Sequence, residues 1–368
     1  MKITIQTQRL KAALSVANKV VKEKTGISSL SNLLIQADNG KATITAGDGS
    51  TFLIIAAETE SQEPGGCTIP AKIFSELIAT ISDDSVMVDM KDGALSADVI
   101  WTNGKATLPA CSTFDYPKVP EIPEGSEIAF SMGAPEFCDA VKMALPAIGD
   151  DPLRPVLAAG YFEYGNESIC LVGTDSKRMH IIPLQGSPSS VGGLLISKDV
   201  LNLLKTILAK EGEVTVYNDL NLVAIKTESI TALIRPVSGK YVAYKSVIPA
   251  RSEEPIVIER DYLAAVLKRM GLADKSSSTV VFELSDGRIK ASAQDISWNT
   301  STSEVIPCNY AGAPVRIGFK ADMLLESILC FDDETLELHV KSERMPMLIR
   351  TPSEENVPSA VMIPTLIR

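Results

Sequence analysis

The residues that could carry out acid–base chemistry are few. The chain has only two histidines, His180 and His339, and both lie in apolar stretches typical of strands, which favours packed rings over catalytic ones. The adjacent carboxylates Asp150 and Asp151 could hold a metal or act as an acid and a base. They precede Pro152 in a loop-like segment, which favours a solvated turn. A hydrolase or transferase using this pair stays open, and it predicts turnover that is lost when either aspartate is changed.

The usual nucleotide and metal motifs do not occur. There is no Gly-x-x-x-x-Gly-Lys loop and no Gly-x-Gly-x-x-Gly sequence, and the segment 47–50 is typical of a tight turn. The six cysteines are scattered without any Cys-x-x-Cys pair, so a zinc site would lack clustered ligands. We therefore expect a protein that is not an enzyme and that binds no metal, nucleotide or other cofactor.

The composition is that of an ordinary globular protein, with 45% hydrophobic residues among 368. No apolar run is long enough to span a bilayer, and the opening MKITIQTQRLKAAL lacks the apolar core of a secretion signal. We expect a cytoplasmic protein with reduced cysteines and no membrane contact. The net charge of −11 argues against general nucleic-acid binding unless basic residues gather on one surface.

The elements that could form such a surface recur three times, about every 125 residues. Each copy contains an apolar strand, the start of a helix, an acidic turn and a second strand. The clearest copies are 67–90, 194–218 and 317–340. Pro70, Ser197 and Lys320 stand at matching points. A repeat of this length is large enough to form a domain with its own core.

Each third also begins with a strand, a polar break and an amphipathic helix. We therefore expect three similar domains, 1–126, 127–252 and 253–368. An alternating hairpin is expected across residues 33–46, and two short helices per domain on antiparallel sheets give an α+β fold class. Other strands are expected at Thr51–Glu58, Val86–Met90, Leu95–Val99, Val214–Tyr217, Val223–Thr227, Thr279–Leu284 and Ile289–Ala293.

The helices pair a buried apolar stripe with basic residues elsewhere on their surface. They are expected over Gln8–Lys24 and Asp261–Leu272 and, in the middle third, from Lys198. Solvated helix faces explain any one of them, but recurrence favours basic faces gathered around a common axis, where an acidic protein could hold an anion. The second helix of the last third, with Asp322 and Glu326, departs from this pattern.

Five stretches carry a resemblance to a known family: LRPVLAAGYFEY from Leu153, LVGTDSKRMHIIPL from Leu171, GKYVAYKSVIP from Gly239, GFKADMLLESIL from Gly318, and the terminal VMIPTLIR. Over essentially its whole length the chain resembles the bacterial DNA sliding clamp, the beta subunit of DNA polymerase III. The resemblance implies a homodimeric ring of six similar domains that encircles duplex DNA without reading its sequence. It implies a processivity factor that tethers the replicative polymerase, the clamp loader and repair proteins, and it makes Asp175 a structural turn residue.

The resemblance assigns DNA contacts to the basic residues of the helices and of the loops that follow them. These are Lys11, Lys19, Lys22, Lys24, Lys142, Arg154, Lys198, Lys205, Lys268 and Arg269. Contacts of this kind with phosphates need no base recognition, so they are compatible with sliding. The resemblance also places Leu272 at the dimer interface, opposite the region 72–78 of the partner subunit.

The partner peptides would bind in a pocket of mostly apolar or small residues. The matching positions are Leu157, Thr174, Ser176, Lys177, Arg178, Met179, Val242, Ser246, Val247, Val361, Ile363, Pro364, Thr365 and Leu366. Val242 stands where the family commonly has proline, and Ser246 where it commonly has arginine, so peptide preference is expected to differ. A repeat-built adaptor that binds peptides without encircling DNA stays open, and it predicts a monomer.

Overall fold

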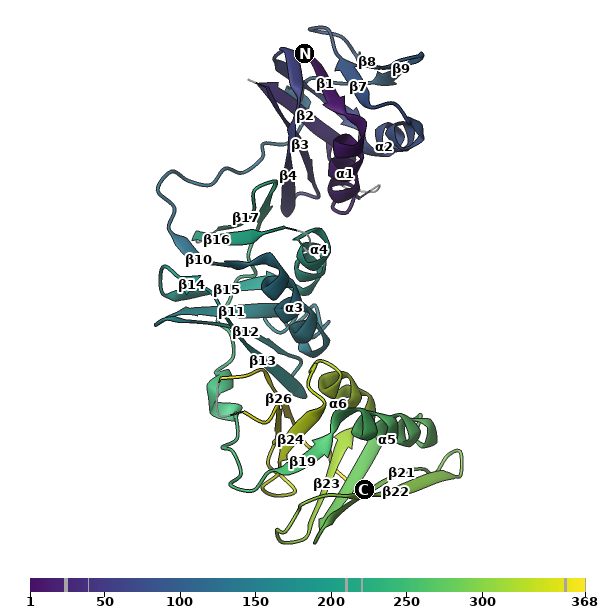
Figure 1. Ribbon diagram of the computed structural model, residues 1–368, viewed down its shortest axis with the longest axis vertical. Helices are drawn as coiled ribbons and strands as arrows, with labels where there is room; N and C mark the ends of the chain where they lie inside the picture. The colour runs from purple at the N-terminus through teal and green to yellow at the C-terminus, as the bar shows by residue number, and fades with distance from the viewer. Residues whose placement is uncertain (23–25, 39, 209–210, 220, 354–355, 368) are drawn as a thin grey trace. The chain divides into compact units, whose positions relative to one another are not determined.

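The structure is a computed structural model that describes residues 1–22, 26–38, 40–208, 211–219, 221–353 and 356–367. Within those residues, helices pack on antiparallel sheets, which confirms the α+β class (Figure 1). The chain divides into two compact units: unit 1 contains residues 1–135 and 206–236, and unit 2 contains residues 136–205 and 237–368. This division does not test the three-domain boundaries, which stay a prediction.

The first third follows the expected order of elements. Its elements are β1 (Lys2–Gln6), α1 (Thr7–Ala17), β2 (Asn32–Asp38), β3 (Lys41–Gly47), β4 (Thr51–Glu58), β5 (Glu60–Glu63), β6 (Gly65–Pro70), α2 (Ala71–Thr80), β7 (Ser85–Asp89), β8 (Ser96–Trp101) and β9 (Gly104–Pro109). The hairpin expected across residues 33–46 is confirmed, because β2 pairs with β3 in antiparallel register.

Helix α1 is shorter than the predicted helix Gln8–Lys24, which is a correction. The helix ends at Ala17, and the next amides donate to carbonyls three residues back, Lys19 to Val16 and Val20 to Ala17, at 3.1 and 3.2 Å. Such bonds tighten a last turn, and the following β-branched pair of valines favours helix less than straight-chain residues do. The buried stripe is nevertheless the one expected, and Val20 remains buried beyond the helix.

The middle and last thirds repeat the order strand, helix, strands, helix, strands. The middle third has β10 (Ile128–Gly133), α3 (Ala134–Ala144), β11 (Ala159–Gly165), β12 (Ser168–Thr174), β13 (Arg178–Leu184), β14 (Ser187–Pro188), β15 (Gly192–Ser197), α4 (Lys198–Leu208), β16 (Glu213–Asp219), β17 (Leu222–Lys226) and β18 (Ile230–Ile234). The last third has β19 (Ile256–Glu259), α5 (Arg260–Ala273), β20 (Thr279–Ser285), β21 (Arg288–Asp295), β22 (Thr300–Pro307), β23 (Val315–Lys320), α6 (Ala321–Ile328), β24 (Thr335–His339), β25 (Met347–Arg350) and β26 (Ser359–Met362).

The threefold repeat of the sequence is also a repeat of strand pairing. The first strand of each third pairs antiparallel with the strand after its second helix, as β1 with β7, β10 with β16 and β19 with β24. Pro70, Ser197 and Lys320, matched in the sequence, each end a strand and directly precede a helix. The acidic turns matched in the sequence precede β7, β16 and β24 in the same way. The residues that match in the sequence repeat therefore occupy equivalent positions in the secondary structure of each third.

Two strand pairs join neighbouring thirds inside the compact units. In unit 1, β4 pairs with β18, and in unit 2, β13 pairs with β26, both antiparallel. Each junction has an apolar cluster beside it, and the cluster in unit 2 includes Met179, Tyr241, Tyr244 and Val361. The backbone of one third is thus continuous in hydrogen bonding with that of the next.

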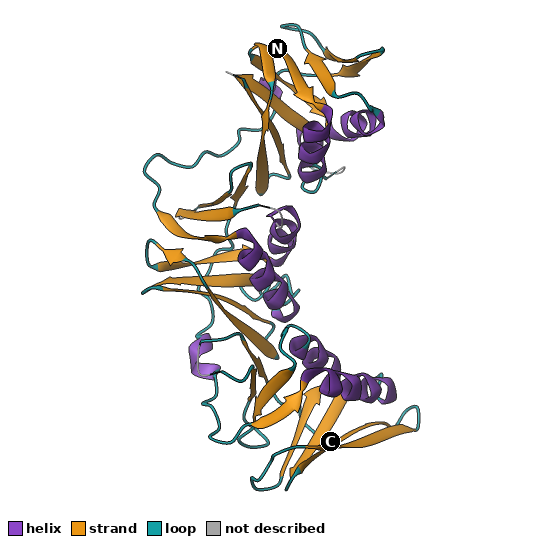
Figure 2. Cartoon of the chain, viewed as in Figure 1, coloured by secondary structure: helices purple, strands orange, loops and turns teal. Residues whose placement is uncertain are grey.

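In the last third, helix α5 covers one face of the sheet β22-β21-β20-β23. Alternate residues of β20, Val280, Phe282 and Leu284, are buried, and so are Leu263 and Leu267 of α5. Figure 2 shows α5 beside α6, and α1 beside α2 in the first third, where the helices also contact each other. Among the described helices, none is both long and apolar enough to cross a bilayer.

Candidate functional site

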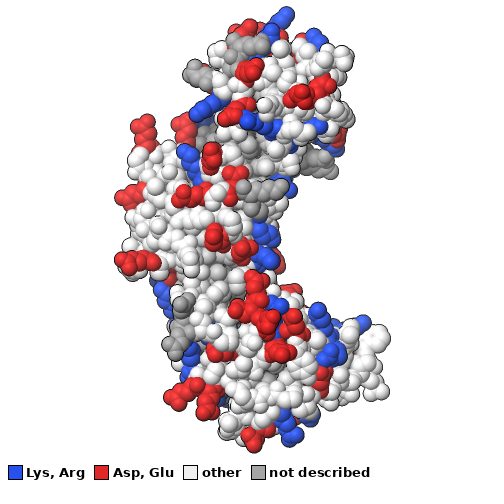
Figure 3. Space-filling view, viewed as in Figure 1, with Lys and Arg blue, Asp and Glu red and all other residues white. Residues whose placement is uncertain are grey.

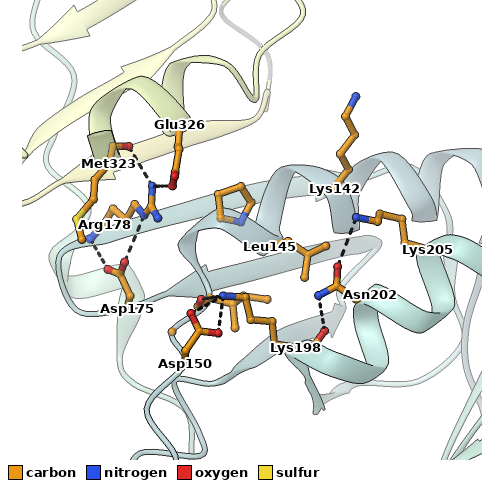
Figure 4. Close-up of a pocket in the computed structure, with 13 residues that line it drawn as sticks. Lys142, Leu145, Asp150, Asp175, Arg178, Lys198, Asn202, Lys205, Met323 and Glu326 are labelled. Atoms are coloured by element: carbon orange, nitrogen blue, oxygen red, sulfur yellow. Dashed lines mark hydrogen bonds and ion pairs between the residues drawn. The ribbon is translucent and has the colours of Figure 1, made fainter. Parts of the chain in front are cut away.

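A cavity of about 620 Å³ in unit 2 brings together several of the candidate DNA-contact residues (Figure 4). Lys142 comes from α3, Lys198 and Lys205 from α4, and Glu326 from α6. Helix α4 buries Leu201 and Leu204, a spacing that leaves both of its lysines off the buried stripe. The fold therefore gathers basic side chains from two helices that are far apart in the sequence.

The lysines of this cavity differ in how they are engaged. Lys198 Nζ donates to both carboxylate oxygens of Asp150 at 2.8 and 2.9 Å, and to the carbonyl of Ile148 at 2.8 Å. Lys205 Nζ lies 3.5 Å from the amide oxygen of Asn202. Lys142 extends away from the labelled carboxylates in Figure 4. In unit 2, an anion approaching α4 would have to draw Lys198 away from Asp150.

Asp150 and Asp151 do not form a shared site, because each carboxylate faces a different cation. Asp151 accepts from Arg154 Nε at 2.9 Å and from the amide of Leu153 at 3.0 Å. The hydrogen bond from Arg154 lowers the pKa of Asp151 below its ordinary value. The Arg154 guanidinium also donates to Ser176 Oγ at 3.0 Å. Two candidate DNA-contact cations are therefore held by the aspartates that first suggested catalysis.

The other candidates for DNA contact are placed separately. In unit 1, Lys22 pairs with Asp48 at 2.7 Å, and Lys11 donates to the carbonyl of Ile81 at 2.7 Å. Burial alone would raise the pKa of Asp48, but hydrogen bonds from Lys22, Ser50 and Thr51 outweigh it and lower the pKa. Lys19 is exposed after α1, and Lys24 lies outside the described residues.

On α5 in unit 2, Lys268 is exposed, whereas Arg269 makes two hydrogen bonds to Glu304 at 2.7 and 2.8 Å. The hydrogen bonds from Arg269 lower the pKa of Glu304. Figure 3 shows that basic and acidic side chains are interspersed on the visible surface of each unit. The sequence pattern located basic helix faces, but it gave no signal for the carboxylates that pair with them.

The turn before β13 is built around Asp175. Its Oδ1 accepts from the amides of Lys177 and Arg178 at 2.8 and 2.9 Å, and Ser176 has a φ of 74°, in the left-handed region. The buried Arg178 pairs with Asp175 at 3.3 Å and with Glu326 of α6 at 2.8 Å, and donates to the Met323 carbonyl at 3.1 Å. The structural role expected for Asp175 is consistent with this geometry, and Arg178 links the middle third to the last.

The histidines were expected to be packed rings rather than catalytic ones, and their surroundings are consistent with this. His180 is buried, with Nδ1 2.6 Å from the Met143 carbonyl and Nε2 2.9 Å from Ser327 Oγ. Burial lowers the pKa of His180 to about 4, so the ring is neutral at pH 7. His339 Nδ1 accepts from the Ser252 amide at 3.0 Å, and burial lowers its pKa too. Both rings have structural partners that sequence reasoning missed.

The positions of the expected peptide pocket all lie in unit 2, but they differ in exposure. Met179 and Val361 are paired across β13 and β26 and belong to the buried cluster. Val247 and Ile363 are 43% and 42% exposed, and the Ile363 amide donates to the Lys177 carbonyl at 2.9 Å. Leu366 is exposed at the end of the described chain. The exposed members can contact a partner, whereas Met179 and Val361 support the surface from below.

The remaining positions of the set fall into the same two groups. Thr174 and Arg178 are buried. The exposed positions are Ser176, Lys177, Val242 and Ser246, and the half-buried ones are Leu157, Pro364 and Thr365. Thr174 Oγ1 donates to the Arg178 carbonyl at 2.7 Å and so supports the Asp175 turn. The amide of Thr365 donates to the Gly318 carbonyl at 2.8 Å, which fixes the tail against β23.

A tyrosine cluster holds the segment that carries Val242 and Val247. Tyr161 stacks on Tyr241 with ring centroids 4.6 Å apart, and Tyr244 donates to Glu163 Oε2 at 2.5 Å. Lys245 Nζ also donates to Glu163, at 2.8 Å. Burial would raise the pKa of Glu163, but these hydrogen bonds lower it. This cluster was not predicted from the sequence, although the two tyrosines of GKYVAYKSVIP, three residues apart, were a visible signal.

Exposed apolar side chains gather at one end of the last third. Leu272 at the end of α5 is 69% exposed, and Ile296 and Trp298 in the turn between β21 and β22 are 86% and 76% exposed. Thr300 Oγ1 donates to the Ala273 carbonyl at 2.6 Å and so joins the start of β22 to the end of α5. Strand β22 is the last strand of its sheet, and β9 is the last strand of the sheet β5-β1-β7-β8-β9 in unit 1.

Among the described residues, no group of three or more His, Cys, Asp or Glu is placed to hold a metal ion.

Two family models match the chain: the N-terminal domain of the DNA polymerase III beta subunit over residues 1–120, and its C-terminal domain over residues 245–365. A beta sliding clamp from Synechococcus elongatus is 21% identical over 362 residues, which are 95% of each chain.

Solved structures show the same fold along the full length of the chain. The DNA polymerase III subunit beta from Pseudomonas aeruginosa superposes with a TM-score of 0.93 at 21% identity, covering 100% of both chains. A sliding clamp from the same organism, bound to griselimycin, gives a TM-score of 0.91 at 21% identity and also covers 100% of both chains. With both family models and relatives of matching length, the chain belongs to the family of DNA polymerase III beta subunits, the bacterial DNA sliding clamps.

Proposed function

We propose that this protein is a DNA polymerase processivity factor that works in the cytoplasm as a homodimeric ring around duplex DNA. The proposal has three domains per subunit, with boundaries at 126/127 and 252/253, and no catalytic activity. The observation that carries it is the match of both family models to a chain whose strand pairing repeats three times. A ring built from repeated modules can hold a polymerase near DNA because it is topologically linked to the duplex, without binding the duplex tightly.

The basic helix residues would contact the phosphates of the duplex. Lys142, Lys205 and Lys268 have no carboxylate partner among the described residues, whereas Lys198, Arg154 and Arg269 would exchange an internal carboxylate for a phosphate. Exposed ion pairs of this kind are worth about 0–1 kcal/mol, so exchange is easy. The resulting contact is weak and sequence-independent, which suits sliding.

The dimer would form where two sheets end in an unpaired edge. A strand edge with free amide and carbonyl groups pairs readily with a strand of another chain. Strand β22 of one subunit and β9 of its partner are the candidates, with Leu272, Ile296 and Trp298 as the apolar contacts beside the edge. Burying these side chains would add hydrophobic stabilisation that scales with the area removed from water.

The partner proteins would bind through an apolar anchor placed against Val242, Val247 and Ile363. These side chains are partly exposed, and the tyrosine cluster with Glu163 fixes the segment that carries two of them. A relative binds griselimycin, and we propose that the compound binds this apolar surface here, which makes it a probe of the pocket. We expect polymerases, the clamp loader and repair proteins to compete with griselimycin for this surface.

Retention on circular DNA tests the proposal. The protein is loaded onto nicked plasmid with the clamp loader of its own cell and ATP, and retention is measured by gel filtration before and after linearisation. A ring is lost when the plasmid is cut, because only topology held it. Equal retention on circular and linear DNA would count against a ring, and light scattering that reports a monomer would favour the peptide-binding adaptor.

A further inference from the structure

A second cavity, of about 940 Å³, lies over the sheet β22-β21-β20-β23 of the last third. Its lining residues on β20 include Thr279 and Val281, which alternate with the buried Val280 and Phe282. Because successive residues of a strand point to opposite faces, the cavity lies on the face away from α5. None of the residues proposed above to contact DNA lines this cavity, whereas Ile296 and strand β22, proposed for the dimer, border it at the far side of the sheet.

The floor of the cavity is a row of small side chains that crosses the sheet. Ser303 is paired with Ser292, Ser292 with Val281, and Val281 with Gly318. The hydroxyls of Ser292 and Ser303 make no hydrogen bond to any other described residue. The row is therefore a shallow trough with hydrogen-bonding groups on its floor. We call it the sheet trough.

The sheet trough is bordered by cations. On one side, Lys290 and Arg316 both pair with Glu283, at 3.2 and 3.5 Å, so two cations share one carboxylate. On the other side, Lys320 donates to the carbonyl of Ser277 and stands opposite Thr279. The border thus carries more positive than negative charge.

Two aspartates also line the cavity, but they do not neutralise the positive charge of the border that a ligand would meet. Asp274 is buried and accepts from the amides of Ser277 and Thr279 at 2.8 and 3.0 Å. Asp295 is buried as well, and it accepts from the amides of Ser297 and Ser276 at 2.9 and 3.3 Å. Because these carboxylates are enclosed and hydrogen-bonded within their own loops, the cations of the border are the charges that an approaching group meets.

One end of the sheet trough is continuous with the proposed partner pocket. Thr365 and Leu366 belong to the positions expected for the pocket, and both line this cavity. The tail lies close over Gly318, where a Cβ atom would stand 3.0 Å from Ile367 and 3.2 Å from the Thr365 carbonyl. The glycine thus lets the tail pack against the sheet edge at the point where the trough begins.

We propose that the sheet trough binds an extended, acidic segment of a partner protein that continues from the anchor in the pocket. The inference rests on the proposed function of that pocket. Crossing from β23 to β22 spans three strand spacings, about 14 Å, which about four extended residues cover. Carboxylates of the segment would pair with Arg316 and Lys320, and its backbone would bond to the serine hydroxyls of the floor.

Tailed ligands test the inference. Griselimycin is linked through a short Gly-Ser spacer to four glutamates or, as the neutral match, to four glutamines, and binding is measured by calorimetry at 50 mM salt. We expect the glutamate tail to bind about fivefold more tightly, as two exposed ion pairs allow. The double variant Arg316→Gln/Lys320→Gln should lose this difference while binding untailed griselimycin normally. The variant Lys91→Gln, which removes an exposed charge in unit 1, should keep it.

The outcomes separate the two proposals. If griselimycin binds but both tails give the same affinity, the sheet trough is not an acidic-peptide site, and the pocket stands. If griselimycin does not bind the wild-type protein, both the pocket and the inference fall. If a dT12 oligonucleotide displaces the glutamate tail without displacing untailed griselimycin, the cations serve nucleic acid and the inference is overturned.

Discussion

Replacement of Asp150 by asparagine tests how the carboxylates that pair with the basic residues control the affinity for DNA. Asp150 is 82% exposed and holds Lys198 through both of its oxygens, while Lys198 is also anchored on the Ile148 carbonyl. In Asp150→Asn the lysine keeps its backbone contact and loses its counter-charge. We therefore expect the variant to bind duplex DNA more tightly than the wild type, although its fold is unchanged.

The magnitude follows from the exposure of the pair. An exposed ion pair is worth about 0–1 kcal/mol, so removing the competition from Asp150 should improve affinity by up to about fivefold. Each phosphate contact that releases counterions adds about 0.9 to the slope of log affinity against log salt. If Lys198 gains a full contact, the slope of Asp150→Asn should become steeper by about that amount.

Fluorescence anisotropy of a labelled duplex between 50 and 200 mM salt measures both quantities. Two variants isolate the cause. Asp150→Asn/Lys198→Gln should lose the gain, because the released cation is gone. Asp199→Asn removes the same charge from the exposed first turn of α4, where no cation is paired with it among the described residues. An equal gain in Asp199→Asn, or no gain in Asp150→Asn, would refute the reasoning.

Three further predictions concern the dimer, the pocket and a buried histidine. Leu272→Asp should give a monomer by light scattering because it places a charge in an apolar contact, whereas Val191→Asp, at another exposed apolar position, should remain a dimer. Val247→Asp should abolish griselimycin binding in calorimetry without changing the size of the protein; unchanged affinity would show that the pocket is elsewhere. The folded pKa of His180, about 4, lies below the ordinary 6.5, so the unfolded chain takes up a proton first as the pH falls. The free energy of unfolding should therefore drop by about 2 kcal/mol between pH 7 and pH 5 through this group, and chemical unfolding of His180→Asn should show a smaller drop; the same drop in both proteins would contradict this assignment.

The sequence predicted the elements well because each third repeats the same local patterns. Thr51–Glu58 was expected as a strand and is one, and the matched residues Pro70, Ser197 and Lys320 all precede helices. The end of α1 was missed because the apolar stripe continues to Val20 after the helix has ended at Ala17. Periodicity reports which residues are buried, and a residue can stay buried in a turn that follows a helix.

The polar contacts between distant segments could not be predicted in the same way. The pairs that engage Lys198, Arg269 and Arg178 join residues 35 to 148 positions apart. Their partners are aspartates and glutamates in turns, strands and another helix, and a composition in which acids outnumber bases offers many candidates for each cation. Likewise, Met179 reads as an anchor in the sequence, but the pairing of β13 with β26 buries it.

If the basic helix residues contact DNA as proposed, these pairings would let an acidic protein slide on an acidic polymer. If every basic residue of the helices were unpaired, each would contribute a phosphate contact. The salt-sensitive affinity would then approach that of a protein that remains bound at one position on DNA. Exposed carboxylates such as Asp150 and Asp151 compete with phosphate for the same cations at a cost of about 1 kcal/mol or less. Under the proposed contacts, a cation would pass from a carboxylate to a phosphate and back with little change in free energy as the duplex moves. The acids beside the basic residues would thus smooth the movement of DNA, and removing them should raise the affinity for DNA and slow sliding.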